Sequence, residues 1–212
     1  KPANGLVPVG HMNEETGKDF RKENGNISSY DLQNAQKIWE EAKKELGVEQ
    51  VNLGFLTFEQ DNAKRMAEYI KGDLEKNLNG LTLQIKQQPF KQKLQLEQTG
   101  DYDITMANWG PDYKDPINYL ELFTTGNPNN KMSYSNSHYD DLIRKAKNDF
   151  VLDPEKRWEA LREAEQVLLE DAAVAPLYHL GSAYVQKDYV KGIAKHQFGG
   201  VYTYKNAYVD KK

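Results

Sequence analysis

One short aromatic loop holds the residues of this sequence that could do the most specific chemistry. Both the two-residue and the 3.6-residue periodicity are broken by the run Trp109-Gly110-Pro111-Asp112-Tyr113-Lys114-Asp115-Pro116. Asp115 precedes a proline, which is typical of a helix N-cap followed by the first helical residue. Asp112 is not placed to cap a helix. It either closes an Asx turn on the backbone N–H of Lys114 or Asp115, or presents a carboxylate to a ligand cation.

Aromatic side chains accompany these acids. Trp109 either plugs the core beneath the loop or forms the floor of a ligand pocket, because an indole can pack on one face and bind on the other. Phe90 and Met106 are more typical of core positions than of a binding site.

The sequence lacks the residue patterns that are typical of metal, cofactor and catalytic sites. The chain contains no cysteine and four histidines, at positions 11, 138, 179 and 196, without metal-ligand spacing. We therefore expect surface or packing histidines and no metal or cofactor. Phosphate-binding, dinucleotide-binding and serine-hydrolase motifs are missing from the sequence. Adjacent acids such as Glu14-Glu15 indicate solvated faces, since 32 acidic residues occur among 212. None of these patterns predicts a catalytic centre.

Charge and hydropathy exclude further classes. The 28 Lys and Arg residues and 32 Asp and Glu residues give a net charge of −4 and are mixed along the chain, which argues against nucleic-acid binding. No apolar run has the roughly 20 residues of a membrane span. The chain opens with Lys1-Pro2-Ala3 rather than a secretion signal, so we expect it to be excised from a longer protein. Its 13 Tyr, 7 Phe and 3 Trp residues indicate a globular fold.

Periodicity predicts the elements that carry the loop. The first 27 residues predict a loop without a helix. The elements expected after them are a helix from Ser29 to Gly47 capped by Ser28 or Ser29, a strand 51–58, a helix 63–78, a strand from Leu81, a helix 90–98 with Phe90, Leu94 and Leu96 facing inward, and a strand 102–108. Strands separated by helices pair most simply in parallel, with right-handed crossovers. The predicted fold class is α/β, and ligands bind such sheets at the carboxyl ends of the strands, where residues 109–116 lie.

The pattern after residue 116 predicts several helices followed by an irregular C-terminal segment. We expect a helix 116–123, a loop 126–131 and two amphipathic helices, the second capped by Asp153 with Pro154 in its first turn. Residues 174–180 predict an edge strand interrupted by Pro176. Residues 183–212 are aromatic and β-like.

The loop and three further segments resemble one protein family. The run from Asn108 to Pro116 resembles the W-x-x-D-Y-x-[DE]-P segment of the bacterial oligopeptide-binding proteins of ABC importers, the dipeptide/oligopeptide solute-binding family. Residues 3–10, 130–143 and 175–178 occur in the order that the family shows, so the resemblance spans nearly the whole chain. It implies a type II periplasmic-binding-protein-like lobe with a mainly parallel sheet flanked by helices.

The resemblance also implies a domain organisation and partners. Residues 1–181 are similar to the second lobe of such a receptor, and residues 182–212 to the segment that returns to pack on the first lobe. We expect the first lobe and the lipoprotein signal of the longer protein to lie outside this sequence. The expected partners are a peptide ligand, the first lobe and an ABC permease in the membrane, for a monomeric protein outside the cytoplasm. It would be held at the cell surface by a lipid anchor or be free in the periplasm.

Site residues follow from the same resemblance. Asp112 matches the acid that pairs with the terminal ammonium of the ligand, and Trp109 matches an aromatic residue beside the ligand. The backbone of Asn108 and Gly110 matches the strand edge that binds the peptide main chain, and Phe90 lies where relatives often place an aromatic residue near side-chain pockets. Met106 stands where some members have an arginine for ligand carboxylates, so that clamp is absent.

Alternatives remain open from the sequence. The same fold receives nickel chelates, haem and oligosaccharides, so a non-peptide ligand is one alternative. A hydrolase or transferase would pair Asp112 with a second titrating group. An interaction module would dock through the aromatic residues 198–208.

Overall fold

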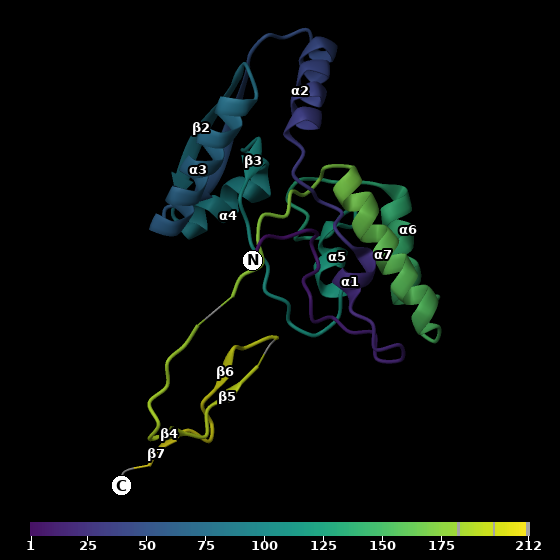
Figure 1. Cartoon of the computed structure of the whole chain (residues 1–212), viewed down its shortest axis with the longest axis vertical. Coiled ribbons are helices and arrows are strands. Elements are labelled where there is room, and N and C mark those ends of the chain that lie inside the picture. Colours follow the sequence, from purple (N-terminus) through teal and green to yellow (C-terminus); the bar gives the residue numbers. More distant parts are fainter. Residues whose placement is uncertain (182, 197, 211–212) are drawn as a thin grey trace. The chain divides into compact units, whose positions relative to one another are not determined.

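Two compact units make up the described part of the chain. The computed structural model describes residues 1–181, 183–196 and 198–210. Unit 1 contains residues Lys1–Ser29 and the described residues from Trp109 onward, and unit 2 contains Tyr30–Asn108. The chain therefore passes from unit 1 into unit 2 after Ser29 and returns at Trp109 (Figure 1).

Unit 2 is a parallel sheet with helices on its faces. Its elements are α2 (Leu32–Leu46), β1 (Val51–Phe58), α3 (Asp61–Asn77), β2 (Leu81–Gln88), α4 (Phe90–Thr99) and β3 (Ile104–Thr105). The strand order is β2-β1-β3. Both strand pairs are parallel, with Val51 opposite Leu81 and Phe55 opposite Ile104. The predicted α/β class and parallel pairing are confirmed.

The third strand is shorter than the predicted range 102–108. Only Ile104 and Thr105 join the ladder, so the expected strand residues 102–103 and 106–108 lie outside it. At the start of the strand a side chain takes the place of a backbone acceptor. The Asp103 carboxylate accepts the backbone N–H of Gly54 at 2.6 Å. A side-chain acceptor here ends the regular pairing before it can extend toward the start of the expected strand.

The apolar face of unit 2 lies between the sheet and α3. Phe55, Leu81 and Leu83 are buried there against Ala67 of α3. The predicted end of α2 at Gly47 is confirmed, since Gly47 has the left-handed conformation with φ of 68°. The predicted cap at Ser28 or Ser29 is wrong. The N-cap is Asp31, whose carboxylate accepts the Asn34 N–H at 3.0 Å.

Helix α4 buries charged residues instead of the predicted apolar ones. Phe90 is 61% exposed and Leu94 is 37% exposed, while Lys93 and Glu97 are buried. Lys93 pairs with the Glu97 carboxylate one turn later and lies over the Phe58 ring, 4.4 Å from its centroid. This pair satisfies both charges inside the protein, so the helix turns its polar stripe toward the sheet.

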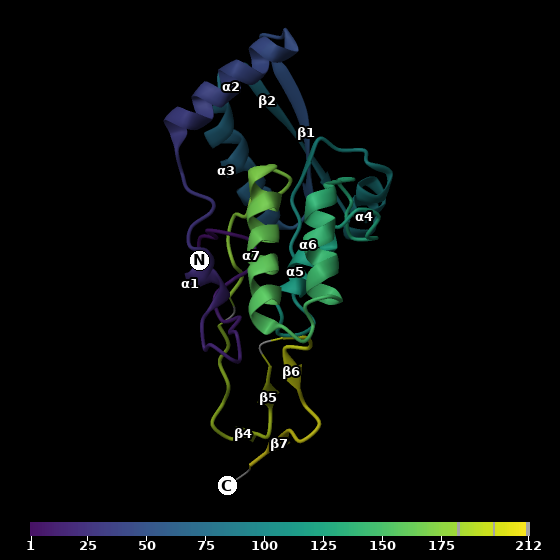
Figure 2. The same ribbon diagram turned by 90° about the vertical axis from the view of Figure 1, so that its right-hand side faces the viewer.

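Unit 1 has a helical core. Its elements are α1 (Phe20–Asn24), α5 (Ile117–Leu120), the 3₁₀ helix η1 (Glu121–Phe123), α6 (Ser137–Lys147), α7 (Pro154–Glu170), and the two-residue strands β4 (Val190–Lys191), β5 (Ala194–Lys195), β6 (Tyr202–Thr203) and β7 (Tyr208–Val209). Helices α6 and α7 lie side by side (Figures 1 and 2). Their apolar stripes meet at Tyr139, Ile143, Leu161 and Leu168. The predicted cap at Asp153 is confirmed, since it accepts the Lys156 N–H at 3.1 Å.

Helix α1 was not expected in the first 27 residues. It has five residues, too few to display a 3.6-residue period, and a buried ion pair fixes it. Arg21 pairs with Glu165 of α7, and its guanidinium also donates to the carbonyl oxygens of Val7 and Asn4 at 3.1 Å each. Asn24 donates to the same carboxylate at 2.6 Å. The N-terminal segment is thereby held on the helical core.

The predicted edge strand at 174–180 is reduced to one bridge. Pro2 and Tyr178 pair in antiparallel fashion, and the Ala3 N–H donates to the Leu177 carbonyl at 3.2 Å. Beyond it, β4 pairs with β7 and β5 with β6, both antiparallel. Four positions of the predicted β-like tail, 182, 197, 211 and 212, lie outside the described residues. Within the described ranges, no helix is both long and apolar enough to cross a bilayer.

Candidate functional site

The loop that carries the predicted site is fixed at its far end by Asp115. This carboxylate accepts the Ile117 N–H at 2.9 Å, as expected for a residue that caps the next helix. Its other oxygen pairs with Arg157 of α7 at 2.9 Å. Arg157 also donates to the Ala146 carbonyl of α6 at 3.0 Å. The end of the loop is therefore tied to both long helices of unit 1.

The start of the loop closes on a buried side chain that the sequence did not identify. The Asn118 side-chain oxygen accepts both the indole N–H of Trp109 and the backbone N–H of Asp112, each at 3.1 Å. Asn118 is only 4% exposed. A polar residue between Ile117 and Tyr119 inside a short apolar helix was the one available signal, and only the fold shows what it binds.

Asp112 is held by its backbone and not by its carboxylate. The residue is exposed, and within residues 1–181, 183–196 and 198–210 no donor reaches its carboxylate oxygens. The alternative of an Asx turn is wrong, because the nearby backbone bond runs from the Asp115 N–H to the Tyr113 carbonyl at 3.0 Å. The carboxylate is thus available to an external cation.

The Trp109 side chain is neither buried in the core nor fully exposed to solvent. Its ring is 39% exposed, and its N–H is bound to Asn118 at 3.1 Å. One part of the indole covers the buried amide, and the rest faces solvent. Gly110 is exposed as well, and a methyl group built at its position would meet nothing within 4 Å.

The other two predicted site residues belong to unit 2. Asn108 is the last residue of unit 2 and is exposed. Phe90 stacks on Phe58, with ring centroids 6.0 Å apart and planes at 13°. The structure brings Trp109 and Asp112 together on Asn118. A shared role of these five residues in one site stays a prediction.

His11 is a packing histidine, as the sequence indicated. It is 2% exposed, and its ring meets the rings of Tyr119 and Phe198 edge to face, at centroid distances of 5.4 and 5.3 Å. Burial lowers its pKa below 6.5, and Lys114 acts in the same direction, while Asp115 and Asp19 oppose the shift. Among the described residues, no group of three or more acidic or histidine side chains could hold a metal ion.

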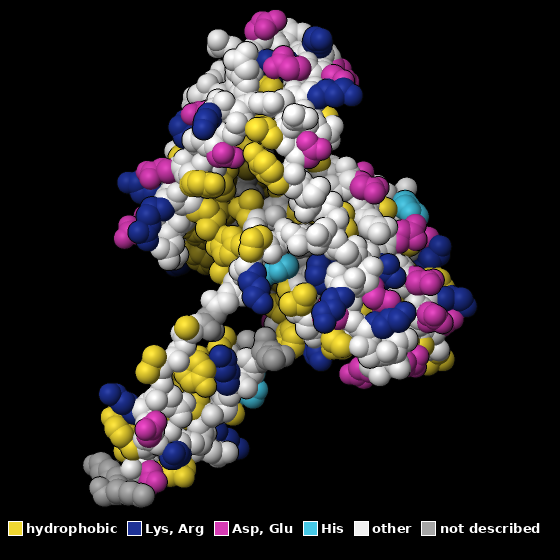
Figure 3. Space-filling model, in the orientation of Figure 1, with side chains coloured by type: hydrophobic (Ala, Val, Ile, Leu, Met, Phe, Trp, Pro, Cys, Tyr) yellow, Lys and Arg dark blue, Asp and Glu magenta, His cyan; other side chains and the backbone are white. Residues whose placement is uncertain are grey.

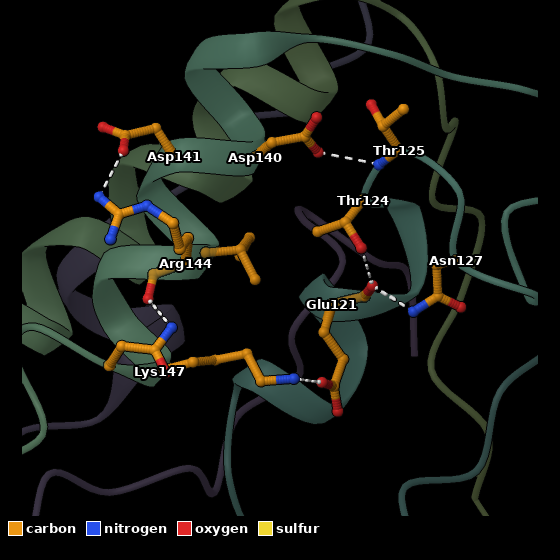
Figure 4. A pocket seen from close by; sticks show the side chains of 10 residues that line it. Glu121, Thr124, Thr125, Asn127, Asp140, Asp141, Arg144 and Lys147 are labelled. Atoms are coloured by element: carbon orange, nitrogen blue, oxygen red, sulfur yellow. Dashed lines mark hydrogen bonds and ion pairs between the residues drawn. The ribbon is translucent and has the colours of Figure 1, made fainter.

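A polar hollow of about 610 Å³ lies elsewhere on unit 1. Figure 4 shows Lys147 directed toward Glu121, Arg144 toward Asp141 and Asp140 toward Thr125. Lys147 pairs with Glu121 at 2.6 Å, and Arg144 pairs with Asp141 at 2.8 Å. The Asp140 carboxylate accepts the Thr125 N–H at 2.9 Å. These charges are paired internally, and no predicted site residue lines the hollow, so it does not compete with the loop at Asp112.

Known proteins resemble the chain in both sequence and fold. The dipeptide-binding protein of Lactococcus lactis subsp. cremoris (strain MG1363) is 32% identical over 209 residues, which cover 98% of this chain and 38% of the relative. The oligopeptide ABC transporter substrate-binding domain of Bacillus anthracis str. Ames is 48% identical with a TM-score of 0.93, over 100% of this chain and 41% of that one. Peptide-bound OppA of Listeria monocytogenes is 43% identical with a TM-score of 0.89, over 100% and 40%.

The chain spans about two fifths of the length of these relatives. Their folds confirm the predicted type II periplasmic-binding-protein-like architecture. The profile described as "Bacterial extracellular solute-binding proteins, family 5 Middle" matches residues 1–131. Since that match covers more than half of the 212 residues, the chain belongs to family 5 of the bacterial extracellular solute-binding proteins.

Proposed function

We propose that this chain is the ligand-holding part of a receptor that captures oligopeptides and delivers them to an ABC permease. Family membership supports a solute-binding role. A relative at 43% identity was solved with a peptide bound, which supports a peptide as the solute. The observation that carries the proposal is the exposed Asp112 carboxylate, which no described donor reaches although its backbone is fixed by Asn118.

The chemistry of the loop suits a ligand that varies in sequence. A receptor for many peptides must direct its bonds to groups that all peptides share, namely the main-chain amides and the charged amino terminus. Asn108 and Gly110 are exposed and lie outside the strand β3, which ends at Thr105, so their main-chain groups are available to bind the peptide amides. Asp112 offers an anion for the ammonium, and such charge-assisted bonds are about twice as strong as neutral ones. The exposed part of Trp109 adds an apolar wall.

No bond-making step is part of this proposal. A hydrolase would need a second titrating group beside Asp112. The nearest acid along the loop, Asp115, is already bound by the Ile117 N–H and by Arg157. Both of its oxygens therefore have structural partners, which favours binding over catalysis.

We also propose that the chain is one part of a longer, two-lobed protein outside the cytoplasm. Residues 1–181 would form the second lobe, and residues 182–212 would pack on a first lobe. Figure 3 shows hydrophobic side chains on the surface of the C-terminal segment. The exposed large hydrophobic residues there include Tyr184, Tyr189, Val201, Tyr204, Tyr208 and Val209. Such a density of exposed aromatic groups is typical of a surface that another part covers. Closure of the lobes by a hinge would capture the ligand.

Calorimetry on the full-length protein tests this function. We expect a mixture of short peptides to bind, with free amino termini preferred over the same peptides after N-acetylation. Mass spectrometry of molecules that co-purify with the protein would then find peptides. The proposal would be overturned if a nickel chelate, haem or an oligosaccharide co-purified with the protein and peptides gave no heat of binding.

A further inference from the structure

The C-terminal segment contacts the candidate site loop directly. Between β5 and β6 the chain turns at Phe198 and Gly199, which we name the hairpin tip; the His196 N–H donates to the Val201 carbonyl at 2.9 Å and closes this turn. The Gly199 N–H donates to the Pro111 carbonyl at 3.0 Å. Pro111 immediately precedes Asp112, so the hairpin tip holds the loop one residue from the carboxylate.

The hairpin tip also contacts the support beneath the loop. The Phe198 ring packs on His11 with centroids 5.3 Å apart, and His11 packs in turn on Tyr119. Tyr119 follows Asn118, whose side chain holds the Asp112 N–H. The loop is therefore bound from two sides, by Asn118 within unit 1's helical core and by the hairpin tip from the C-terminal segment.

Glycine is favoured at the contact position. Gly199 has φ of +67°, a conformation that costs other residues energy. A side-chain carbon built there would lie 3.3 Å from the Asp112 carbonyl oxygen. The next residue, Gly200, lacks a positive φ and would meet nothing within 4 Å. The two neighbouring glycines thus provide a variant and its matched control.

We propose that the hairpin tip is a positioning element for Asp112, so that the C-terminal segment sets the affinity for an amine-bearing ligand. This inference rests on the proposed function. A carboxylate on a loop loses affinity when the loop has more conformations to lose on binding. Fixing the backbone at both Pro111 and Asp112 limits where the carboxylate can lie before the ligand arrives.

The test compares Gly199→Ala with Gly200→Ala in the full-length protein. Binding of one tripeptide is measured by calorimetry, with its amino terminus free and with it acetylated. We expect Gly199→Ala to weaken binding of the free amine about tenfold and to leave the acetylated form unchanged. Gly200→Ala should bind both forms as the wild type does. Phe198→Ala, which adds no atom to the turn, should reproduce the selective loss if Gly199→Ala fails to fold.

Measuring Gly199→Ala in a protein that already carries Asp112→Asn distinguishes a positioning role from a general loss of binding. In an Asp112→Asn protein, Gly199→Ala should cause no further loss, because the two changes act through one carboxylate. Equal binding by Gly199→Ala and Gly200→Ala, or an undiminished loss in the Asp112→Asn background, would overturn the positioning role alone. A wild type without preference for the free amine would overturn the proposed function and the positioning role with it.

Discussion

The buried side-chain oxygen of Asn118 accepts the backbone N–H of Asp112 at 3.1 Å, and the Asp112 carboxylate has no donor among the described residues. The same oxygen accepts the Trp109 indole N–H. One amide thus fixes an aromatic ring and an acid three residues apart. Asn118 therefore holds the acid through its main chain and not through its carboxylate.

Replacing Asn118 should destabilise unit 1 and loosen the loop. In Asn118→Ala the Trp109 indole and the Asp112 backbone lose their acceptor, and the free energy of unfolding should fall by about 1–3 kcal/mol. Urea unfolding measures this loss. Asn34→Ala, an exposed change on α2, is the control, and an Asn118→Ala chain as stable as this control would show that the two bonds contribute nothing.

His11 should make the stability depend on pH in a defined direction. Burial lowers its pKa in the folded state, with Lys114 adding to the shift and Asp115 and Asp19 opposing it. Below pH 6.5 the unfolded chain therefore binds more protons at this ring than the folded chain does. The free energy of unfolding should fall as the pH drops from 6.5 toward the lowered pKa, and this contribution should be constant above 6.5.

His11→Phe keeps an aromatic ring between Tyr119 and Phe198 and removes the titration. Unfolding curves collected between pH 5 and 7.5 should give a smaller slope for this variant than for the wild type. Identical slopes would exclude His11 as the source.

Removing one partner of the buried ion pair in α4 should lower the free energy of unfolding more than replacing both partners. Lys93→Met leaves Glu97 charged and buried, with Thr105 as a hydrogen-bond donor at 2.8 Å. The unfolding free energy should drop by about 3–5 kcal/mol. The double variant Lys93→Met with Glu97→Leu should regain most of that stability. A double variant as unstable as the single one would show that the pair itself, rather than the stranded charge, matters.

A buried hydroxyl in β1 should be dispensable. Within the described residues, Thr57 Oγ1 has no hydrogen-bond partner, and neither does the side-chain nitrogen of Gln87, the residue opposite it on β2. Thr57→Val should therefore raise the unfolding free energy by about 1 kcal/mol. Thr82→Val, at an exposed position of the neighbouring strand, should change it little. Loss of stability in Thr57→Val would mean that an ordered water pairs this hydroxyl.

Local patterns predicted the elements whose causes are local. Alternation of apolar residues identified β1 and β2, and the Asp153-Pro154 pair identified the start of α7, because these signals act within a few residues. The loop at Asp112 was located because it follows a parallel strand and lacks periodicity. Its assignment as a ligand site came from the family resemblance and is still a prediction.

What the sequence missed depends on partners far along the chain. The interior of α4 was assigned to Phe90 and Leu94, although Lys93 and Glu97 are buried, since nothing local shows that the two charges would pair under Phe58. Asn118 was overlooked because its two donors are defined only after the loop closes. The contact between Gly199 and Pro111 joins residues 88 apart along the chain, which no pattern of composition indicates.

Calorimetry of Asp112→Asn in the full-length protein tests whether this carboxylate binds the amino terminus of the ligand. One tripeptide is titrated with a free and with an acetylated amino terminus, and Glu14→Gln, an exposed change of equal charge in the same unit, is the control. We expect Asp112→Asn to lose about 2–5 kcal/mol of binding free energy for the free amine only, while Glu14→Gln binds as the wild type does. An Asp112→Asn protein that binds the free amine with wild-type affinity would contradict this expectation.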